Sequence, residues 1–294
     1  MSWVVDNQLT RFQKFCVNVI KCGPIPRHIA IIMDGNRRYA IRNKMGKTEG
    51  HTKGFERLAE CLLWCRELGV KEVTVYAFSI ENFNRTIEEV DTLMSLAKEK
   101  FERVFEEKDK IMMEGIKIRV IGNLSLVPED IRILLAKSVL LTKDNDKSIL
   151  NIAFSYTARD EIVHSMKTVV EGLESKKIKP ADVDADLISY CMYSNQSPDP
   201  DILIRTSGEV RLSDFLLWQI SQHTQICFTS VLWPDFSIWH LLGCIFKYQR
   251  AFPGLKKYAD ECQSNRKKLN DRITSFLGDI EKKRMEQMEI YAKT

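Results

Sequence analysis

Short apolar segments alternate with helix-forming stretches along most of this 294-residue chain. Six segments are rich in β-branched and aromatic residues, as buried strands are, and the stretches between them show the apolar spacing of helices. Strands separated by helices pair in parallel and are covered on both faces. The alternation predicts an α/β fold with a central, mostly parallel six-stranded sheet flanked by helices, its strands at residues 28–33, 70–78, 116–121, 150–156, 202–205 and 226–231.

Two further segments flank this pattern. Apolar residues recur at helical spacing from Trp3 to Ile20, and Gly23 and Pro24 then end the helix. Such an amphipathic helix either packs on the domain or lies on a membrane surface. From about Pro253 the chain is charged and helix-prone, as in a solvated helix or a partner-facing arm. We therefore divide the chain into an N-terminal amphipathic helix over 1–22, a main domain over 23–250 and a charged helical C-terminal tail over 251–294.

The composition excludes several classes of protein. The eight cysteines form no CxxC pair, which argues against a zinc site and favours a reducing compartment. We find no secretory signal pattern and no apolar run of membrane-spanning length. The net charge of +4 is too small to indicate nucleic acid. A modest positive excess instead suits phosphorylated substrates or an anionic membrane surface.

Polar clusters follow the first, second and fifth expected strands, where ligands of parallel sheets collect. In the first cluster, Asp34 is a charge placed directly after a buried strand, which is costly unless something uses it. Gly35 permits close approach, Asn36 offers an amide, and Arg37 and Arg38 suit phosphate. An acid among phosphate-binding bases indicates a Mg²⁺ bridge to substrate, although a salt-bridged turn is the simpler alternative.

The second cluster contains Ser79, Asn82 and Arg85. The segment from Thr86 to Glu89 fits a capping box and is explained as the start of the next helix, over 86–114. That cap leaves the three preceding side chains unexplained. They are therefore candidates for ligand contact.

In the third cluster, Arg205, Arg211 and Ser213 are able to converge on a second polyanion, with Glu209 orienting one of the arginines. The alternative is an ion-pair network in a loop. A weaker phosphate signal is the GHTKG segment around His51, which also fits a plain helix start.

Together these segments resemble the cis-prenyltransferase family, whose bacterial members make undecaprenyl diphosphate. The resemblance runs from about His28 to Phe246 and rests on MDGNRR, GHxxG, FSxEN, IRTSGExRxSDFLxWQ and LWPDF. Arg37, Tyr39 and the N-terminal helix are most similar to the eukaryotic dehydrodolichyl diphosphate synthase branch. The resemblance implies sequential condensation of isopentenyl diphosphate onto farnesyl diphosphate, giving a long-chain polyprenyl diphosphate for dolichol synthesis and protein glycosylation.

The resemblance also implies roles for the matching residues. Asp34 would hold Mg²⁺, the expected cofactor, and would act in catalysis with Ser79 and Asn82. The allylic diphosphate would lie among Gly35, Asn36, Arg37, Arg38, His51 and Arg85. Isopentenyl diphosphate would bind Arg205, Arg211 and Ser213. The apolar stripe from Val90 to Phe105, which by itself is typical of a core, would line a channel for the growing chain.

Two departures from the family pattern affect these expectations. Bacterial homodimeric members carry a Glu shortly before LWPDF. Here Ser221 to Gln225 contains no carboxylate, so this stretch offers no second protein ligand for the metal. The C-terminal Arg-x-Gly motif of homodimeric members is also missing. In the eukaryotic branch a Nogo-B receptor-type subunit supplies it. We therefore expect a heteromer with such a subunit, associated peripherally with the cytosolic face of the endoplasmic reticulum membrane, and no nucleic-acid partner.

Two other functions compete with this one. A non-catalytic accessory subunit of the same fold would lack the Asp and the phosphate-binding Arg set, and this chain carries both. A phosphatase would use Asp34 as its nucleophile, but Asn36 stands where such enzymes place a second acid.

Overall fold

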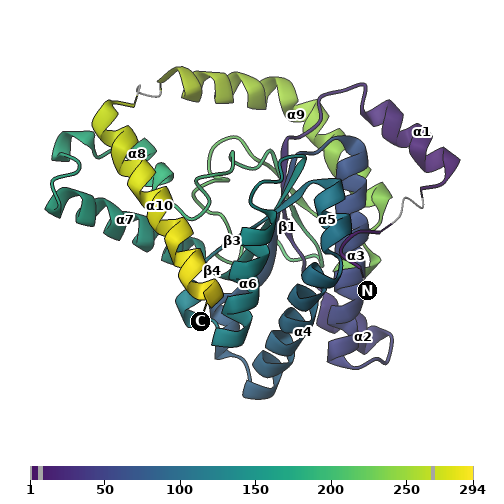
Figure 1. Ribbon diagram of the computed structural model, residues 1–294. Helices are drawn as coiled ribbons and strands as arrows, with labels where there is room; N and C mark the ends of the chain where they lie inside the picture. Colours follow the sequence, from purple (N-terminus) through teal and green to yellow (C-terminus); the bar gives the residue numbers. More distant parts are fainter. Residues whose placement is uncertain (1, 6–8, 266–268, 294) are drawn as a thin grey trace.

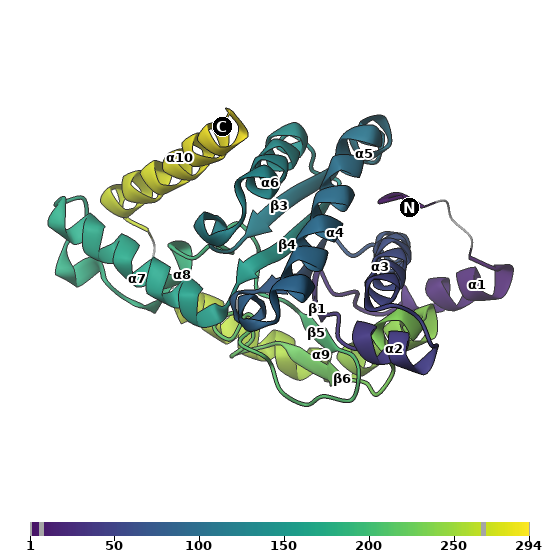
Figure 2. The same ribbon diagram turned by 90° about the horizontal axis from the view of Figure 1, so that it is seen from below.

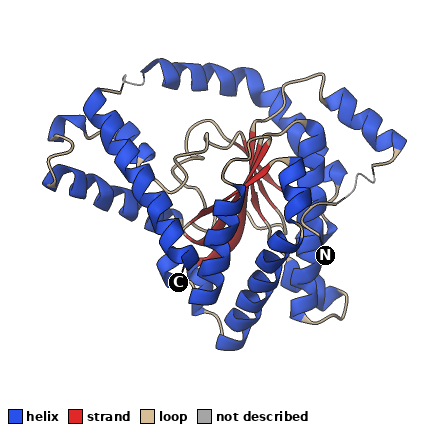
Figure 3. Cartoon of the chain, in the orientation of Figure 1, coloured by secondary structure: helices blue, strands red, loops and turns tan. Residues whose placement is uncertain are grey.

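The computed structural model describes residues 2–5, 9–265 and 269–293. Its centre is a six-stranded sheet with the order β3-β4-β2-β1-β5-β6, in which every neighbouring pair is parallel (Figures 1 and 3). The predicted α/β class is thereby confirmed. The strands are β1 (His28–Ile32), β2 (Glu72–Ser79), β3 (Ile116–Ile121), β4 (Ser148–Tyr156), β5 (Ile202–Arg205) and β6 (Gln225–Phe228).

Helices cover both faces of this sheet. They are α1 (Arg11–Ile20), α2 (Asn36–Arg42), α3 (Lys47–Leu68), α4 (Ile87–Glu106), α5 (Lys108–Glu114), α6 (Glu129–Thr142), α7 (Ala158–Glu174), α8 (Ala185–Tyr190), α9 (Ile238–Asn265) and α10 (Asp271–Lys293). The main core lies between one face and α3, α4, α6 and α9. A smaller core covers the other face, and α7 and α8 lie on the far side from α3 (Figure 2). Within the described ranges, no helix is both long and apolar enough to cross a bilayer.

Three helices differ from the sequence expectation. The N-terminal helix begins at Arg11, because Thr10 and Gln13 form a capping box there, and Trp3 is instead buried against the main domain. The helix expected over 86–114 is interrupted at Glu107, which ends α4 and precedes α5. Helix α9 runs through Pro253 and so crosses the expected boundary at residue 250. The three-part division of the chain therefore remains a prediction.

The central strands are irregular where they approach their carboxyl ends. Ala77 of β2 and Ser155 of β4 are each passed over in the pairing register. The first irregularity breaks the strict alternation of side chains, so that Phe78 enters the main core while Tyr76 packs on the other face. Bulges of this kind re-aim side chains and are common beside functional sites.

Candidate active site

A cavity of about 1070 Å³ lies at the carboxyl ends of β1, β2 and β5. It is lined by every residue for which a site role was expected, namely Asp34, Gly35, Asn36, Arg37, Arg38, His51, Ser79, Asn82, Arg85, Arg205, Arg211 and Ser213. The structure thus brings the three sequence clusters together. Their individual roles remain predictions. Apolar side chains from α3 and α4 extend the cavity away from these groups, among them Phe55, Leu58, Leu93, Ala97 and Phe101.

Asp34 is held by contacts from β5 and the residue after it. Its backbone N–H donates to Thr206 Oγ1 at 3.0 Å, and the Thr206 hydroxyl donates to the Asp34 carbonyl oxygen at 2.7 Å. Its carboxylate Oδ2 accepts from Arg205 Nη2 at 2.9 Å, and Oδ1 lies 3.8 Å from Arg38 Nη2. Because the Arg205 side chain is only 2% exposed, this carboxylate balances a buried charge.

The donor set around Asp34 fits a magnesium ion that is completed by substrate. The Asp34 side chain remains 32% exposed, so its oxygens are accessible from the cavity. Across the described part of the chain, no group of three or more His, Cys, Asp or Glu side chains is arranged to hold a metal by itself. Mg²⁺ commonly binds through one or two carboxylates plus phosphate oxygens, so a single Asp beside arginines suited to phosphate is a donor set of that kind.

Two arginines of the cavity share one carboxylate, that of Glu89. Its Oε1 accepts from Arg85 Nη1 at 2.7 Å and from Arg37 Nη1 at 3.2 Å. Burial opposes ionisation of Glu89, but the two arginines outweigh it and lower the pKa of this carboxyl. The expected capping box of Thr86 and Glu89 is only half formed. The backbone N–H of Glu89 bonds to the Thr86 hydroxyl, whereas the carboxylate contacts the arginines.

The third cluster is connected to Asp34 through Arg205. Arg205 Nη1 donates to Ser213 Oγ at 2.7 Å and also to the carbonyl oxygen of Arg211. Glu209 pairs with Arg211, and its Oε1 lies 3.4 Å from Arg38 Nη2. It therefore orients one arginine from each of the two groups of side chains that were expected to bind a diphosphate. A single buried guanidinium therefore joins the two halves of the cavity.

Ser79 and Asn82 serve a local structural role as well as lining the cavity. The Ser79 hydroxyl accepts from the Glu81 N–H at 3.2 Å, and Asn82 Oδ1 accepts from the Ser79 N–H at 3.1 Å. Together they cap the short 3₁₀ helix Ile80–Asn84. They were unexplained in the sequence because this turn, unlike the start of α4, carries no recognisable helix pattern.

The glycines of the GHTKG segment are explained by packing of α2 on α3. A Cβ at Gly50 would lie 2.6 Å from the backbone oxygen of Asn36, and one at Gly54 would clash with the Asn36 side chain. These glycines let the two helices approach closely, whereas His51 and Lys47 of the same helix line the cavity.

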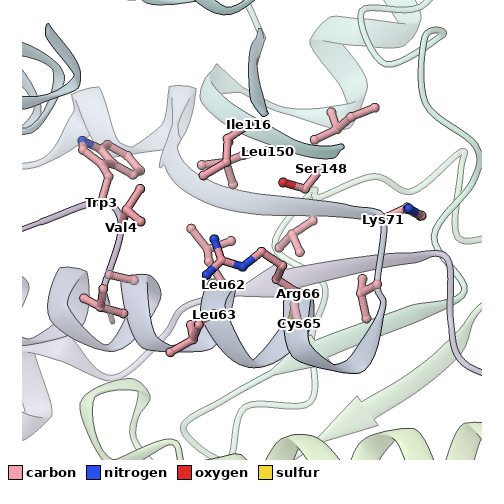
Figure 4. Close-up of a pocket in the computed structure, with 15 residues that line it drawn as sticks. Trp3, Val4, Leu62, Leu63, Cys65, Arg66, Lys71, Ile116, Ser148 and Leu150 are labelled. Carbon is pink, nitrogen blue, oxygen red and sulfur yellow. The ribbon is translucent and has the colours of Figure 1, made fainter. Parts of the chain in front are cut away.

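A second, much smaller cavity of about 50 Å³ lies between α3 and the sheet (Figure 4). Trp3 lines both cavities and forms part of the wall between them. Its indole N–H donates to the Lys100 carbonyl oxygen at 2.7 Å, and its ring meets Phe55 edge-on at 4.7 Å. Glu107 Oε2 accepts from the Trp3 backbone N–H at 2.8 Å and fixes this segment at the apolar end of the large cavity.

Comparisons with known proteins point to one family. The Prenyltransf family model, described as undecaprenyl diphosphate synthase, matches residues 32–252. The chain is 50% identical over 268 residues to the human dehydrodolichyl diphosphate synthase complex subunit, covering 91% of this chain and 80% of that protein. It is 43% identical over 249 residues to the corresponding Schizosaccharomyces pombe subunit, covering 85% and 93%.

A solved structure has a similar fold. The lavandulyl diphosphate synthase of Lavandula x intermedia, in complex with dimethylallyl diphosphate, superposes with a TM-score of 0.72 and 32% identity. The match covers 76% of this chain and 95% of that one.

Proposed function

Because this chain belongs to the cis-prenyltransferase family, we propose that it condenses isopentenyl diphosphate repeatedly onto farnesyl diphosphate and so makes a long-chain polyprenyl, dehydrodolichyl, diphosphate. The product would serve dolichol synthesis and protein glycosylation. The observation that carries the proposal is a cavity lined by two arginine-containing groups of side chains and by an apolar arm. The human and fission-yeast relatives are named as subunits of a dehydrodolichyl diphosphate synthase complex.

The allylic half of the cavity would stabilise a leaving diphosphate. Breaking the allylic C–O bond places negative charge on that group, and Arg37, Arg38 and Arg85 supply cationic donors from the cavity lining. Since Glu89 and Glu209 orient these arginines in advance, little reorganisation is needed as the charge develops. Magnesium held by Asp34 would neutralise the diphosphate oxygens.

The second half would hold the attacking substrate. Arg205, Arg211 and Ser213 would bind the diphosphate of isopentenyl diphosphate. The terminal double-bond carbon of this substrate attacks the allylic carbon as the allylic C–O bond breaks, and the cation left on the neighbouring carbon is quenched by loss of a proton from the next carbon. Ser79 at the end of β2 and Asn82 in the turn after it would position the reacting groups for that loss. The apolar arm along α3 and α4 would take up the lengthening chain and keep water away from it.

The catalytic proposal is tested by incorporation of labelled isopentenyl diphosphate. Asp34→Ala should reduce incorporation at least a hundredfold, because the carboxylate balances the charge of Arg205 and would also hold the metal. Asp34→Asn keeps the shape and should be nearly as inactive. Equal incorporation by wild type and both variants would favour a non-catalytic accessory subunit. A trapped phosphoaspartate at Asp34 would favour a phosphatase.

We further propose that the enzyme is a heteromer with a Nogo-B receptor-type subunit, which would supply an Arg-x-Gly motif to this cavity. The names of the human and fission-yeast relatives as complex subunits support this. The measurement is elongation of farnesyl diphosphate by the purified chain with and without that subunit. An unchanged rate would contradict the dependence.

Peripheral attachment to the cytosolic face of the endoplasmic reticulum membrane is the corresponding proposal for α1. This helix packs through Val17, while Phe12 and Phe15 are 65% and 62% exposed. Trp239 of α9 is also exposed and lies 5.9 Å from the Phe12 ring, so the apolar surface spans two helices. The double variant Phe12→Ser, Phe15→Ser should reduce flotation with phospholipid vesicles, whereas the exposed Ile87→Ser on α4 should not.

A further inference from the structure

The loop that carries Ser213 has an unusual backbone. Ser213, Asp214 and Leu216 have φ values of 50°, 56° and 48°, in the left-handed region that residues other than glycine rarely adopt. Three such residues within four positions do not hold this conformation by themselves. Surrounding structure has to impose it, and backbone strain of this kind concentrates at functional sites.

Tyr76 of β2 makes two separate contacts with this loop. Its ring stacks on Phe215, with the centroids 4.4 Å apart and an interplanar angle of 14°. Its hydroxyl lies 3.2 Å from the Ser213 carbonyl oxygen and 3.1 Å from the Tyr156 carbonyl oxygen. Because carbonyls only accept, the hydroxyl is the donor, and its one proton is shared between the two oxygens. The hydroxyl is therefore directed at the backbone of the residue whose side chain bonds Arg205.

The other side of the loop is fixed from α7. Asp214 Oδ2 accepts from Arg159 Nε at 2.7 Å, and the Asp214 carbonyl oxygen accepts from the Ala158 N–H at 2.8 Å. The Asp214 carboxylate thus sits at the N-terminus of a long helix, where a negative charge is favoured. Asp214 contacts the helix rather than the proposed ligand groups. From the sheet, the loop is contacted by Arg205 of β5 and the Tyr156 ring of β4 as well as by Tyr76 of β2.

We propose that Tyr76 is a positioning residue for the second substrate: its hydroxyl holds the Ser213 carbonyl, keeps the left-handed loop in place and so presents Ser213 and Arg205 to the diphosphate of isopentenyl diphosphate. This inference rests on the proposed assignment of that diphosphate to the Arg205–Ser213 group. Tyr76 acts through the loop. Burial raises the pKa of its phenol to about 12, despite an opposing interaction with Ser79, so the hydroxyl keeps its proton across the physiological range.

The test separates the two contacts of Tyr76. Tyr76→Phe retains the ring that stacks on Phe215 and removes only the hydroxyl. The readouts are the KM for isopentenyl diphosphate at saturating farnesyl diphosphate, the KM for farnesyl diphosphate at saturating isopentenyl diphosphate, and the thermal unfolding midpoint. All are measured on the full chain with its partner subunit. We expect the first KM to rise about fivefold to tenfold, the scale of one lost hydrogen bond, and the second to stay within about twofold.

Tyr193→Phe is the matched control. Tyr193 packs in the same small core, and its hydroxyl contacts Asp160 at 3.4 Å without touching the Ser213 loop. It should leave both KM values unchanged. The inference is overturned if Tyr76→Phe changes neither KM, or changes both equally with a lowered unfolding midpoint. The substrate assignment has a test of its own, Arg211→Ala. If this variant shows no selective rise in the KM for isopentenyl diphosphate, the substrate assignment is overturned, and this inference with it.

Discussion

The imidazole of His51 lines the cavity beside two arginines. The pKa of His51 is lowered from its ordinary value of 6.5 to about 4. Burial of the ring is the largest cause, and the positive charges of Arg85 and Arg37 add to it. The folded protein therefore holds His51 neutral, with one N–H donor, at physiological pH. A diphosphate placed among the same arginines would oppose their effect and raise this pKa.

The depressed pKa of His51 predicts a specific pH dependence of stability. Between about pH 6.5 and pH 4 the unfolded chain binds a proton at His51 that the folded chain does not, so the free energy of unfolding falls as the pH decreases through that window. The full effect is about 3 kcal/mol. His51→Gln should remove this contribution. The difference in the free energy of unfolding between wild type and variant, measured by chemical denaturation at each pH, should then rise from pH 4 to pH 6.5 and stay constant above that. A difference that is constant over the whole range would contradict the lowered pKa.

Glu89 gives a second prediction at the scale of single residues. Glu89→Ala removes the carboxylate that aligns Arg37 and Arg85 and leaves two like charges side by side. We expect the KM for farnesyl diphosphate to rise about fivefold, with little change for isopentenyl diphosphate. Glu56→Ala, which breaks a half-buried pair with Lys53 on α3, is the control. A lowered KM in Glu89→Ala would mean that net charge matters more here than alignment.

At the scale of elements, the α2–α3 contact should tolerate no added side chain. The atom nearest a Cβ at Gly50 is the backbone oxygen of Asn36, which cannot rotate away. Gly50→Ala should therefore displace α2, lower the free energy of unfolding by about 1–3 kcal/mol and impair turnover by moving Asn36. Gly243→Ala in α9 meets nothing within 4 Å and should stabilise by about 0.5–1 kcal/mol. Equal melting shifts for the two variants would rule out the close-packing explanation.

The elements that sequence predicts well are those whose signal is local. β1 and β3 were located to within one residue because each is a short segment rich in β-branched residues and bounded by turn residues. The interruption at Glu107 was missed, and so was the tertiary contact at the same residue, whose carboxylate accepts from the backbone of Trp3, more than a hundred residues away.

The candidate site divides in the same way. Asp34 and the arginines are identifiable because charges after buried strands are unusual in any sequence. Glu89 and Tyr76 are not, since a helix-start Glu and a strand Tyr have ordinary local explanations. Their partners, Arg37 and Ser213, become neighbours only in the folded chain. The bulge at Ala77 is equally invisible, because it is a property of strand pairing rather than of one strand.

At the scale of the whole molecule, α10 lies beside α6 and is joined to α7 and α8 through a third apolar core (Figure 1). Arg284 of α10 donates to Asn195 Oδ1 at 2.7 Å and to the Met192 carbonyl oxygen at 2.9 Å. The adjoining Ser194 bonds the fully buried Glu161, which also holds Gln219 at the end of the Ser213 loop. The C-terminal helix therefore supports the second half of the cavity from a distance.

This arrangement predicts that Arg284→Leu loosens the segment over 192–197. The variant leaves the Met192 carbonyl and the Asn195 side chain without their donor and should lower the free energy of unfolding by about 1–3 kcal/mol. Hydrogen exchange should accelerate in 192–197 and much less in the central strands. Lys282→Leu, on an exposed position of the same helix, is the control. Exchange that accelerates uniformly would indicate global destabilisation instead.

The left-handed backbone at Ser213, Asp214 and Leu216 has a consequence for how this sequence can change. Selection for thermal resistance alone would drive these positions toward glycine, which adopts such φ values without strain. Each residue instead retains a side chain with a distant partner: Arg205 for Ser213, Arg159 for Asp214, and the apolar interior for Leu216. In laboratory evolution, heat-tolerant lineages and high-turnover lineages should therefore diverge first at this loop.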